Sequence, residues 1–352
     1  MSSIWNWFYD YCDSSPEAEE VGELFDRGWN IFSDSPEEGI HWFKKARDLA
    51  AEHGHQKAAL MCDHWHLQVL LKSSGDLDEM QRIAVAATVA ARAPELSDLP
   101  QRVCLHEDLI YTFILADPFG FSKEIEQSLE YMATEVDPST ECARCLLRLH
   151  SQYALAKDDR DHAAECISKH RAQNQGASSE DVYHRCNAMR DYCQLAFQRE
   201  EWQELLDAAI AGVPDSQEYE QPPAFAEFMA WQALACRRLN DEPKALIAYK
   251  TAEAQMSQMR LETSFFDAMS AFHESADEIE AAIKIRNKQL QQFEGSNRHW
   301  QQCNVLIQRG RLFQKSGKAE LAEQDFAAAT ELATSLRSKA TVLDRVSAAR
   351  DE

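Results

Sequence analysis

The chain has 352 residues, of which 45% are hydrophobic and 27% are charged, so it carries enough apolar material for a large core and is not a disordered protein. Its 59 acidic and 36 basic side chains give a net charge of -23, which disfavours binding to nucleic acids and to anionic membrane surfaces. The first residues lack the pattern of a secretion signal, and no apolar run reaches about 18 residues. We therefore expect a cytoplasmic protein without nucleic-acid or membrane partners.

The composition favours α-helices throughout the chain. Ala, Glu, Gln and Leu are abundant, whereas the 11 glycines and 10 prolines cluster between periodic segments. No segment alternates apolar and polar residues as a strand would. The 10 cysteines stand mostly among apolar neighbours at helical positions, where a thiol behaves as a small buried hydrophobe. These features predict an all-α protein from a reducing compartment.

An aromatic segment opens the chain, within a predicted capping helix at residues 1–19. Four of its rings fall on adjoining stripes of this helix, namely Trp5, Trp7, Phe8 and Tyr11. In one interpretation the helix caps the first repeat and buries its rings against Phe25, Trp29 and Phe32. In the other, the rings form a second interface that binds a partner or a second copy of the chain, which would make a homo-oligomer.

Two segments near the start have the sequence form of a helical hairpin. In residues 28–50, Gly39, Phe43 and Ala46 recur at helical spacing in the second helix of the unit. In residues 72–91, small and apolar residues recur in the same way. Both segments are therefore expected to pair two antiparallel helices.

A cluster of histidines and one cysteine lies between these two segments and raises the question of a metal site. Cys62 and His66 would share one helical face at i and i+4, with His64 between them. The alternating histidines cannot all face one point, and no second cysteine pair or acidic ligand stands at a fixed spacing nearby. We expect structural or surface histidines, with Cys62, His64 and His66 as weak metal candidates, and no cofactor.

The clearest repeat lies at residues 303–333. Gly310 and Ala322 would allow two helices to approach closely, and Phe326 would fill the space between them. Gly317 stands between the two helices and can adopt the left-handed conformation that ends the first one. This segment is therefore expected to be a tightly packed helical hairpin.

Residues 229–252 repeat this layout, with Asn240 in the place of the turn glycine because asparagine tolerates the same conformation. Weaker copies complete a series of about eight hairpins with a period of about 40 residues. The order of small residue, aromatic, turn glycine, then alanine, aromatic and alanine resembles the tetratricopeptide repeat family. The resemblance implies an α-solenoid, a superhelix of about eight antiparallel hairpins, over residues 20–334. We expect residues 335–352 to be a C-terminal capping helix or tail.

In the family that this chain resembles, the first helices of successive repeats line a concave groove that binds peptides. Carried over position by position, the resemblance places these basic and amide side chains in the groove: Arg148, Gln152, Asn187, Arg190, Gln194, Arg237, Asn304, Arg311 and Lys315. Within a chain of charge -23, such a face would attract an acidic peptide segment. The alternative is that these side chains pair with neighbouring glutamates. In the seventh unit the groove positions hold Phe266, Ser270, His273 and Glu274, and the third unit is too degenerate to place. The continuity of the groove is therefore open in these two units.

The sequence contains no catalytic motif of the common kinds, such as a phosphate-binding glycine loop, a nucleophile elbow, a zinc-protease helix or a dinucleotide fingerprint. We therefore expect a non-enzymatic scaffold or adaptor whose groove binds a peptide or helical segment of another protein. The alternative is a regulatory or sensory subunit whose superhelix changes shape when it binds a signalling peptide or a small ligand. An enzyme or metal protein built on the histidine cluster is a third hypothesis.

Overall fold

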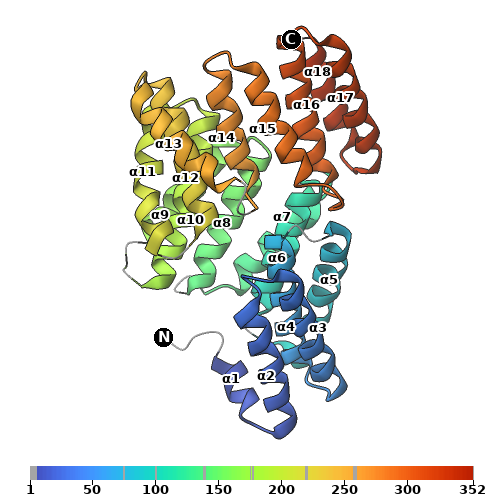
Figure 1. The fold of residues 1–352 in the computed structure, drawn as a ribbon. Coiled ribbons are helices and arrows are strands. Elements are labelled where there is room, and N and C mark those ends of the chain that lie inside the picture. Colours follow the sequence, from blue (N-terminus) through green and yellow to red (C-terminus); the bar gives the residue numbers. More distant parts are fainter. Residues whose placement is uncertain are drawn as a thin grey trace. The chain divides into compact units, whose positions relative to one another are not determined.

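A computed structural model of the chain describes residues 6–73, 76–99, 101–137, 140–174, 176, 178–218, 221–256 and 260–351. Every regular element within these residues is helical, and neighbouring helices pack as sequential pairs (Figure 1). This arrangement is consistent with a helical repeat and confirms the predicted all-α class. Among the described residues, no helix is long and apolar enough to cross a membrane.

Contacts between the helices divide the chain into two units. Unit 1 comprises Met1–Leu115, Lys123–Val136 and Gly295–Asn297, and unit 2 comprises Ala116–Ser122, Asp137–Glu294 and Arg298–Glu352. Residues 20–334, which we expected to form one array, are therefore shared between the two units.

Unit 1 is built around buried aromatic rings. Its helices are α1 (Asn6–Cys12), α2 (Pro16–Ile31), α3 (Pro36–Glu52), α4 (Gln56–Ser73), α5 (Leu77–Ala90), α6 (Arg102–Ala116) and α7 (Ser122–Glu135), with a 3-10 turn at Pro94–Leu96. Phe25 and Phe43 are buried between α2 and α3 with their ring centroids 5.2 Å apart. A Cβ atom at Gly28 would lie 3.1 Å from the Phe43 ring, so the glycine permits this close approach. Helices α2 and α3 thus form a hairpin where the sequence predicts one.

Unit 2 contains a series of five hairpins within the described residues, followed by a last helix. The elements are α8 (Glu141–Ala156), α9 (Arg160–Gln173), α10 (Ser179–Gln198), α11 (Trp202–Glu218), α12 (Pro222–Arg238), α13 (Glu242–Gln255), α14 (Thr263–Glu274), α15 (Ile279–Gln291), α16 (His299–Lys315), α17 (Ala319–Leu332), a 3-10 turn at Ala333–Ser335, and α18 (Lys339–Asp351). The first helices α8, α10, α12 and α14 also contact one another in series. Helix α18 packs on α16 and α17 through Val342, Val346 and Ala349, which are all buried.

The turns inside these hairpins share one backbone conformation. Each contains a residue with a φ angle between 57° and 73°, namely Asp158, Glu200, Asn240, Asp277 and Gly317. The residue that follows donates a hydrogen bond to the carbonyl five positions earlier, as Asp241 does to Cys236 at 2.8 Å, and this bond closes the last turn of the first helix. Successive turn residues lie 42, 40, 37 and 40 positions apart, which gives the repeat period a geometric basis. The conformation predicted for Asn240 and Gly317 is confirmed.

Close packing in the last hairpin depends on Gly310. A Cβ atom at this position would lie 2.5 Å from Cε1 of Phe326, far inside van der Waals contact. Phe326 is fully buried, and its ring fills the space between α16 and α17. Gly212 in α11 stands in the same relation to Phe228 in α12, where a Cβ atom would lie 2.2 Å from the ring. The predicted packing of Gly310 against Phe326 is therefore confirmed.

Candidate partner-binding face

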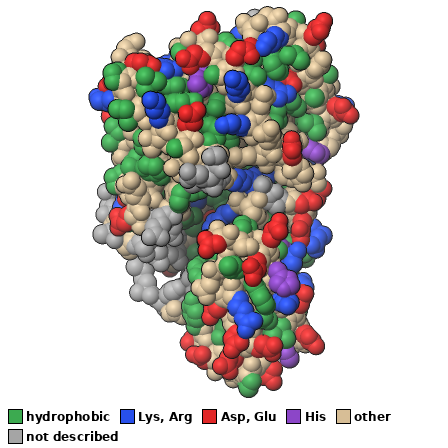
Figure 2. Space-filling model, viewed as in Figure 1, with side chains coloured by type: hydrophobic (Ala, Val, Ile, Leu, Met, Phe, Trp, Pro, Cys, Tyr) green, Lys and Arg blue, Asp and Glu red, His purple; other side chains and the backbone are tan. Residues whose placement is uncertain are grey.

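The predicted groove residues all lie in unit 2, on the first helices of its hairpins. By helix, they are Arg148 and Gln152 on α8; Asn187, Arg190 and Gln194 on α10; Arg237 on α12; and Asn304, Arg311 and Lys315 on α16. Because α8, α10 and α12 contact one another in series, the residues on these three helices belong to one layer. On the face that Figure 2 shows, acidic and basic side chains are interspersed. What each predicted residue can bind therefore depends on the side chains that it already contacts.

Asp191 on α10 links α8 to α10. Its carboxylate is buried and accepts hydrogen bonds from Ser151 Oγ at 2.6 Å and from Gln152 Nε2 at 3.5 Å. Burial raises the pKa of Asp191 above its usual value, although the charge of Arg148 and the hydrogen bond from Ser151 act in the opposite direction. Arg148 also donates a hydrogen bond to the Tyr183 hydroxyl at 3.2 Å. Two predicted residues, Arg148 and Gln152, are thus held beside one buried acid.

An ion pair joins α10 to α12. Nε and Nη2 of Arg190 lie 2.8 and 2.7 Å from Oε2 of Glu227, which is almost fully buried. Ser264 on α14 donates a hydrogen bond to Oε1 of Glu227 at 2.6 Å and extends the network to a fourth helix. Burial acts to lower the pKa of Arg190, but the charge of Glu227 outweighs it and raises the pKa above its usual value. Asn187, which is also buried, accepts a hydrogen bond from Arg190 Nη1 at 3.4 Å.

Arg237 lies in a separate network at the end of α12. Its guanidinium carbon is 3.5 Å from the centroid of the Phe272 ring, an arrangement that stabilises the cation against the ring face. Its Nη2 atom lies 2.6 Å from Oε1 of Glu242, and only 9% of the Arg237 side chain is exposed. Arg237 is therefore engaged inside the protein.

The remaining predicted residues are half-buried or exposed. Asn304 on α16 accepts a hydrogen bond at 2.8 Å from an arginine of α18. Lys315 is 58% exposed, and its Nζ atom lies 3.4 Å from Oε2 of Glu274. Gln194 and Arg311 are half-buried. The contacts of Asn304 and Lys315 lie outside the network of Asp191 and Glu227.

The basic side chains predicted to attract an acidic partner differ in what they already contact. Arg190 and Arg237 are buried against carboxylates of the chain, as the alternative of internal pairing expects. Withdrawing Arg190 would leave the buried carboxylate of Glu227 unpaired, at a cost of about 3–5 kcal/mol, whereas Glu242, the partner of Arg237, has a side chain that is 52% exposed. Lys315 is the most exposed of the basic side chains described above, and it also contacts a carboxylate, that of Glu274.

Three of the aromatic residues of α1, Trp7, Phe8 and Tyr11, are buried or half-buried in unit 1, whereas Tyr9 is exposed. Phe8 is almost fully buried, and its ring centroid lies 4.7 Å from that of Phe25. The indole nitrogen of Trp7 donates a hydrogen bond within unit 1 at 2.7 Å, and Tyr11 is half-buried. Trp5, the fourth predicted ring, lies outside the described residues. Of the three described rings, Phe8 makes the contact with Phe25 that the capping interpretation names.

The three weak metal candidates lie on α4 and contact different neighbours. Cys62 is fully buried, and burial raises the pKa of its thiol well above the usual value. His64 Nδ1 lies 2.7 Å from Oδ2 of Asp108, whereas burial lowers the pKa of His66 to about 4. In the part of the chain that the structure describes, no three His, Cys, Asp or Glu side chains are placed to hold one metal ion.

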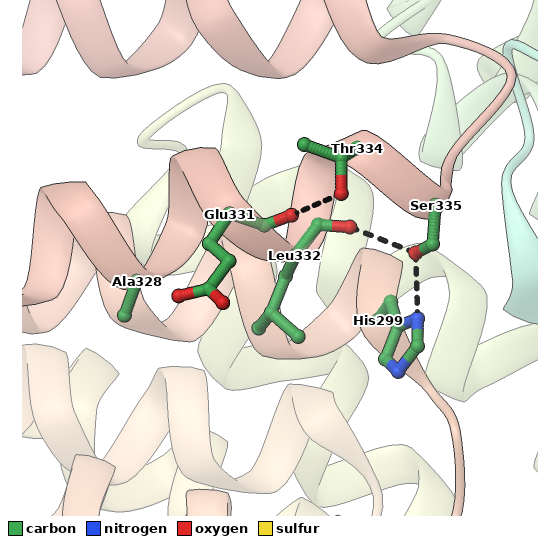
Figure 3. Close-up of a pocket in the computed structure, with 6 residues that line it drawn as sticks. All are labelled: His299, Ala328, Glu331, Leu332, Thr334 and Ser335. Carbon is green, nitrogen blue, oxygen red and sulfur yellow. Dashed lines mark hydrogen bonds between the residues drawn. The ribbon is translucent and has the colours of Figure 1, made fainter.

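A cavity of about 410 Å³ opens on the surface between the start of α16 and the end of α17 (Figure 3). It is lined by His299, Ala328, Glu331, Leu332, Thr334 and Ser335. His299 Nδ1 lies 2.7 Å from Ser335 Oγ, and Ser335 Oγ donates a hydrogen bond to the Leu332 carbonyl at 2.8 Å. These contacts join the start of α16 to the turn that follows α17.

The sequence does not single out the two buried acids, Asp191 and Glu227, that contact the predicted groove residues. Asp191 lies 40 positions after Ser151, and Glu227 lies 37 positions after Arg190. Both separations are about one repeat, so each contact joins equivalent faces of neighbouring first helices. A search for hydrogen-bonding or oppositely charged residues one repeat apart would have found both pairs.

Comparison with known proteins provides no family for this chain. No protein-family model matches it, and a search of curated proteins finds no matching sequence.

Proposed function

We propose that the chain is a tetratricopeptide-like interaction protein without enzymatic activity. The repeat identity is supported by the sequential hairpins, by a left-handed turn residue about every 40 positions in unit 2, and by small residues such as Gly310 that face buried rings. Hairpins of this kind contact their neighbours in series, and their first helices present an extended surface. The proposed binding face is formed by α8, α10 and α12 and continues on α16.

The observation that carries this proposal is the polar network through Asp191 and Glu227. These two buried acids hold Arg148 and Gln152 on α8 and Arg190 on α10. Because the side chains are already ordered, a partner that contacts them loses little additional conformational entropy on binding. A face fixed in this way suits recognition of an extended or helical segment of another protein.

The partner segment is proposed to be acidic. The half-buried Arg148 and Arg311 and the exposed Lys315 provide positive charge on a chain whose net charge is -23. Basic side chains in such surroundings attract carboxylates, while the rest of the surface repels them. The difference between these basic side chains and the negatively charged remainder of the surface would direct an acidic segment to the proposed binding face.

A charge-reversal experiment tests the binding face and leaves the buried Arg190–Glu227 pair intact. The test variant combines three substitutions on first helices, Gln194→Glu, Arg311→Glu and Lys315→Glu. The control variant makes the same charge change with three exposed residues on second helices, Gln203→Glu, Lys169→Glu and Lys244→Glu. Circular dichroism checks that both variants are folded, and proteins cross-linked to each variant in a native extract are identified by mass spectrometry.

The two variants are expected to behave differently. The test variant should lose partners that the native protein and the control variant both retain, and the lost partners should contain acidic segments. If both variants keep the same partners as the native protein, the proposed face is not the binding site.

A regulatory role that responds to a small ligand is the second candidate function. The observation in its favour is the buried Arg298 together with the half-buried Arg260, for which Glu262 is the acid whose charge acts on both within the described part of unit 2. An unbalanced buried charge of this kind can be neutralised by a bound anion.

A further inference from the structure

Several buried or half-buried arginines of unit 2 are paired with carboxylates. Three examples have an acidic oxygen within 2.7 Å, namely Arg190 with Glu227, Arg286 with Asp267, and Arg309 with Asp325. Arg298 is similarly buried, with 5% of the residue exposed. Its Nε and Nη2 atoms nevertheless have no hydrogen-bond partner among the described residues. Arg298 therefore departs from the pattern of the other buried arginines.

The charge of a second arginine, Arg260, acts on Arg298. Burial and the charge of Arg260 together lower the pKa of Arg298 to about 9. The Nη1 atom of Arg260 is also buried and has no hydrogen-bond partner in the described part of the chain. Glu262 is the acid whose charge acts on both arginines. Two cations thus share one nearby carboxylate, which leaves an excess of buried positive charge.

The first turn of α16 adds to this positive potential. Arg298 is the residue that precedes this 17-residue helix, no side chain caps its first N–H groups, and its first turn contains no acidic residue. The first N–H groups of a helix have no partners within the helix and carry a partial positive charge. They can therefore contribute backbone donors to the same anion as the two arginines.

The number of available donors suits a phosphate group better than a carboxylate. Nε and Nη2 form the side of a guanidinium that donates two parallel hydrogen bonds to two oxygens of one anion. With Nη1 of Arg260 and the first N–H groups of α16, the number of donors exceeds the two oxygens of a carboxylate. Phosphate groups have more acceptor oxygens and bind readily at helix N-termini.

We propose that Arg260, Arg298 and the first turn of α16 form a binding site for a phosphate group, carried either by inorganic phosphate or by a phosphate monoester. The site uses residues that the proposed partner-binding face does not use. Because a buried, unpaired guanidinium is costly, the bound anion stabilises the folded state.

The melting temperature of the full-length protein tests this site directly. Inorganic phosphate is titrated at constant ionic strength maintained with sodium chloride, and phenyl phosphate is titrated in parallel to separate free phosphate from monoesters. The native protein is compared with Arg298→Gln, Arg260→Gln and Arg27→Gln, the last being an exposed control with the same charge change. Saturating phosphate should raise the melting temperature of the native protein and of Arg27→Gln by roughly 3 °C. It should not raise that of Arg298→Gln, and should raise that of Arg260→Gln less.

The melting temperatures in phosphate-free buffer distinguish an anion site from an arginine whose charge is already balanced within the protein. In phosphate-free buffer, Arg298→Gln should melt at or above the temperature of the native protein, because the substitution removes an unpaired buried charge. A lower melting temperature for Arg298→Gln in this buffer, or an equal response of all variants to phosphate, would overturn the proposal. Neither result would bear on the charge-reversal test of the partner-binding face.

Discussion

The buried carboxylate of Asp117 accepts hydrogen bonds from the backbone N–H of Ser338 at 2.8 Å and from its hydroxyl, although 221 positions separate the two residues. The same carboxylate accepts a hydrogen bond from the backbone N–H of Gly120 at 2.8 Å. Phe119 packs on Trp300 with the ring centroids 5.4 Å apart. The loop after α6 is thus attached to the part of unit 2 that carries α16 and α18.

Asp117→Ala should loosen this attachment. The substitution leaves the N–H groups of Gly120 and Ser338 without their acceptor, which should lower the free energy of unfolding by about 1–3 kcal/mol. Urea denaturation measures the loss, and hydrogen exchange should locate it to α18. Asp344→Ala, at an exposed position of α18, is the control and should change the stability by less than about 0.5 kcal/mol. Equal losses in the two variants would contradict the structural role of Asp117.

Gly310→Ala should destabilise the protein, even though alanine favours a helix over glycine by about 1 kcal/mol. The new Cβ atom would lie 2.5 Å from Cε1 of Phe326, so the ring or a helix must move, at a cost of about 1–3 kcal/mol. In a double-mutant cycle with Phe326→Leu, the two losses should be clearly less than additive, because the smaller side chain makes room. An additive cycle would mean that the two residues are not in contact.

Glu200→Gly should stabilise the protein by about 0.5–1 kcal/mol. Glu200 has a φ angle of 57°, a conformation that is unfavourable for residues with a Cβ atom and accessible to glycine. Glu200→Ala removes the same carboxylate but keeps the Cβ atom, so this control should bring no such gain. Urea denaturation of both variants provides the comparison, and equal effects would rule out relief of backbone strain.

His66 should make the stability fall as the pH drops from 6.5 toward 4. Burial lowers the pKa of His66 in the folded state to about 4, against about 6.5 in an unfolded chain. In this window the unfolded state binds a proton that the folded state does not, so the stability is complete above pH 6.5 and decreases on acidification. His66→Gln should reduce this decrease by about 1–3 kcal/mol, whereas the exposed control His41→Gln should not. Parallel pH profiles for native protein and His66→Gln would contradict the prediction.

The parts of the fold that could be predicted from sequence have local signals. Gly310, Gly317 and Phe326 lie within one repeat, so their spacing alone predicts the turn and the packing of the ring. The left-handed turns at Glu200 and Asp277 were not predicted, because neither residue is the glycine or asparagine that marked the turns at Gly317 and Asn240 in the sequence. The division into two units was not predicted either, since it depends on contacts between segments distant in the chain.

The candidate site was less predictable than the fold. The resemblance to the repeat family placed Arg190 on a first helix, but its pairing depends on Glu227, which belongs to the next repeat. Arg260 and Arg298 stand just before helices α14 and α16, so no helical periodicity drew attention to them. Their significance comes from the absence of partners among the described residues, which only the packed structure reveals.

The one-repeat separation of the Ser151–Asp191 and Arg190–Glu227 contacts limits how the gene could change in length. Recombination that removed or duplicated one hairpin in this stretch would place Asp191 or Glu227 opposite a side chain from another repeat. A buried acid without its donor costs several kcal/mol, roughly 3–5, so such a product would be poorly stable. We therefore expect the hairpins from α8 to α13 to be inherited as a block of fixed length, with insertions and deletions confined to the chain on either side.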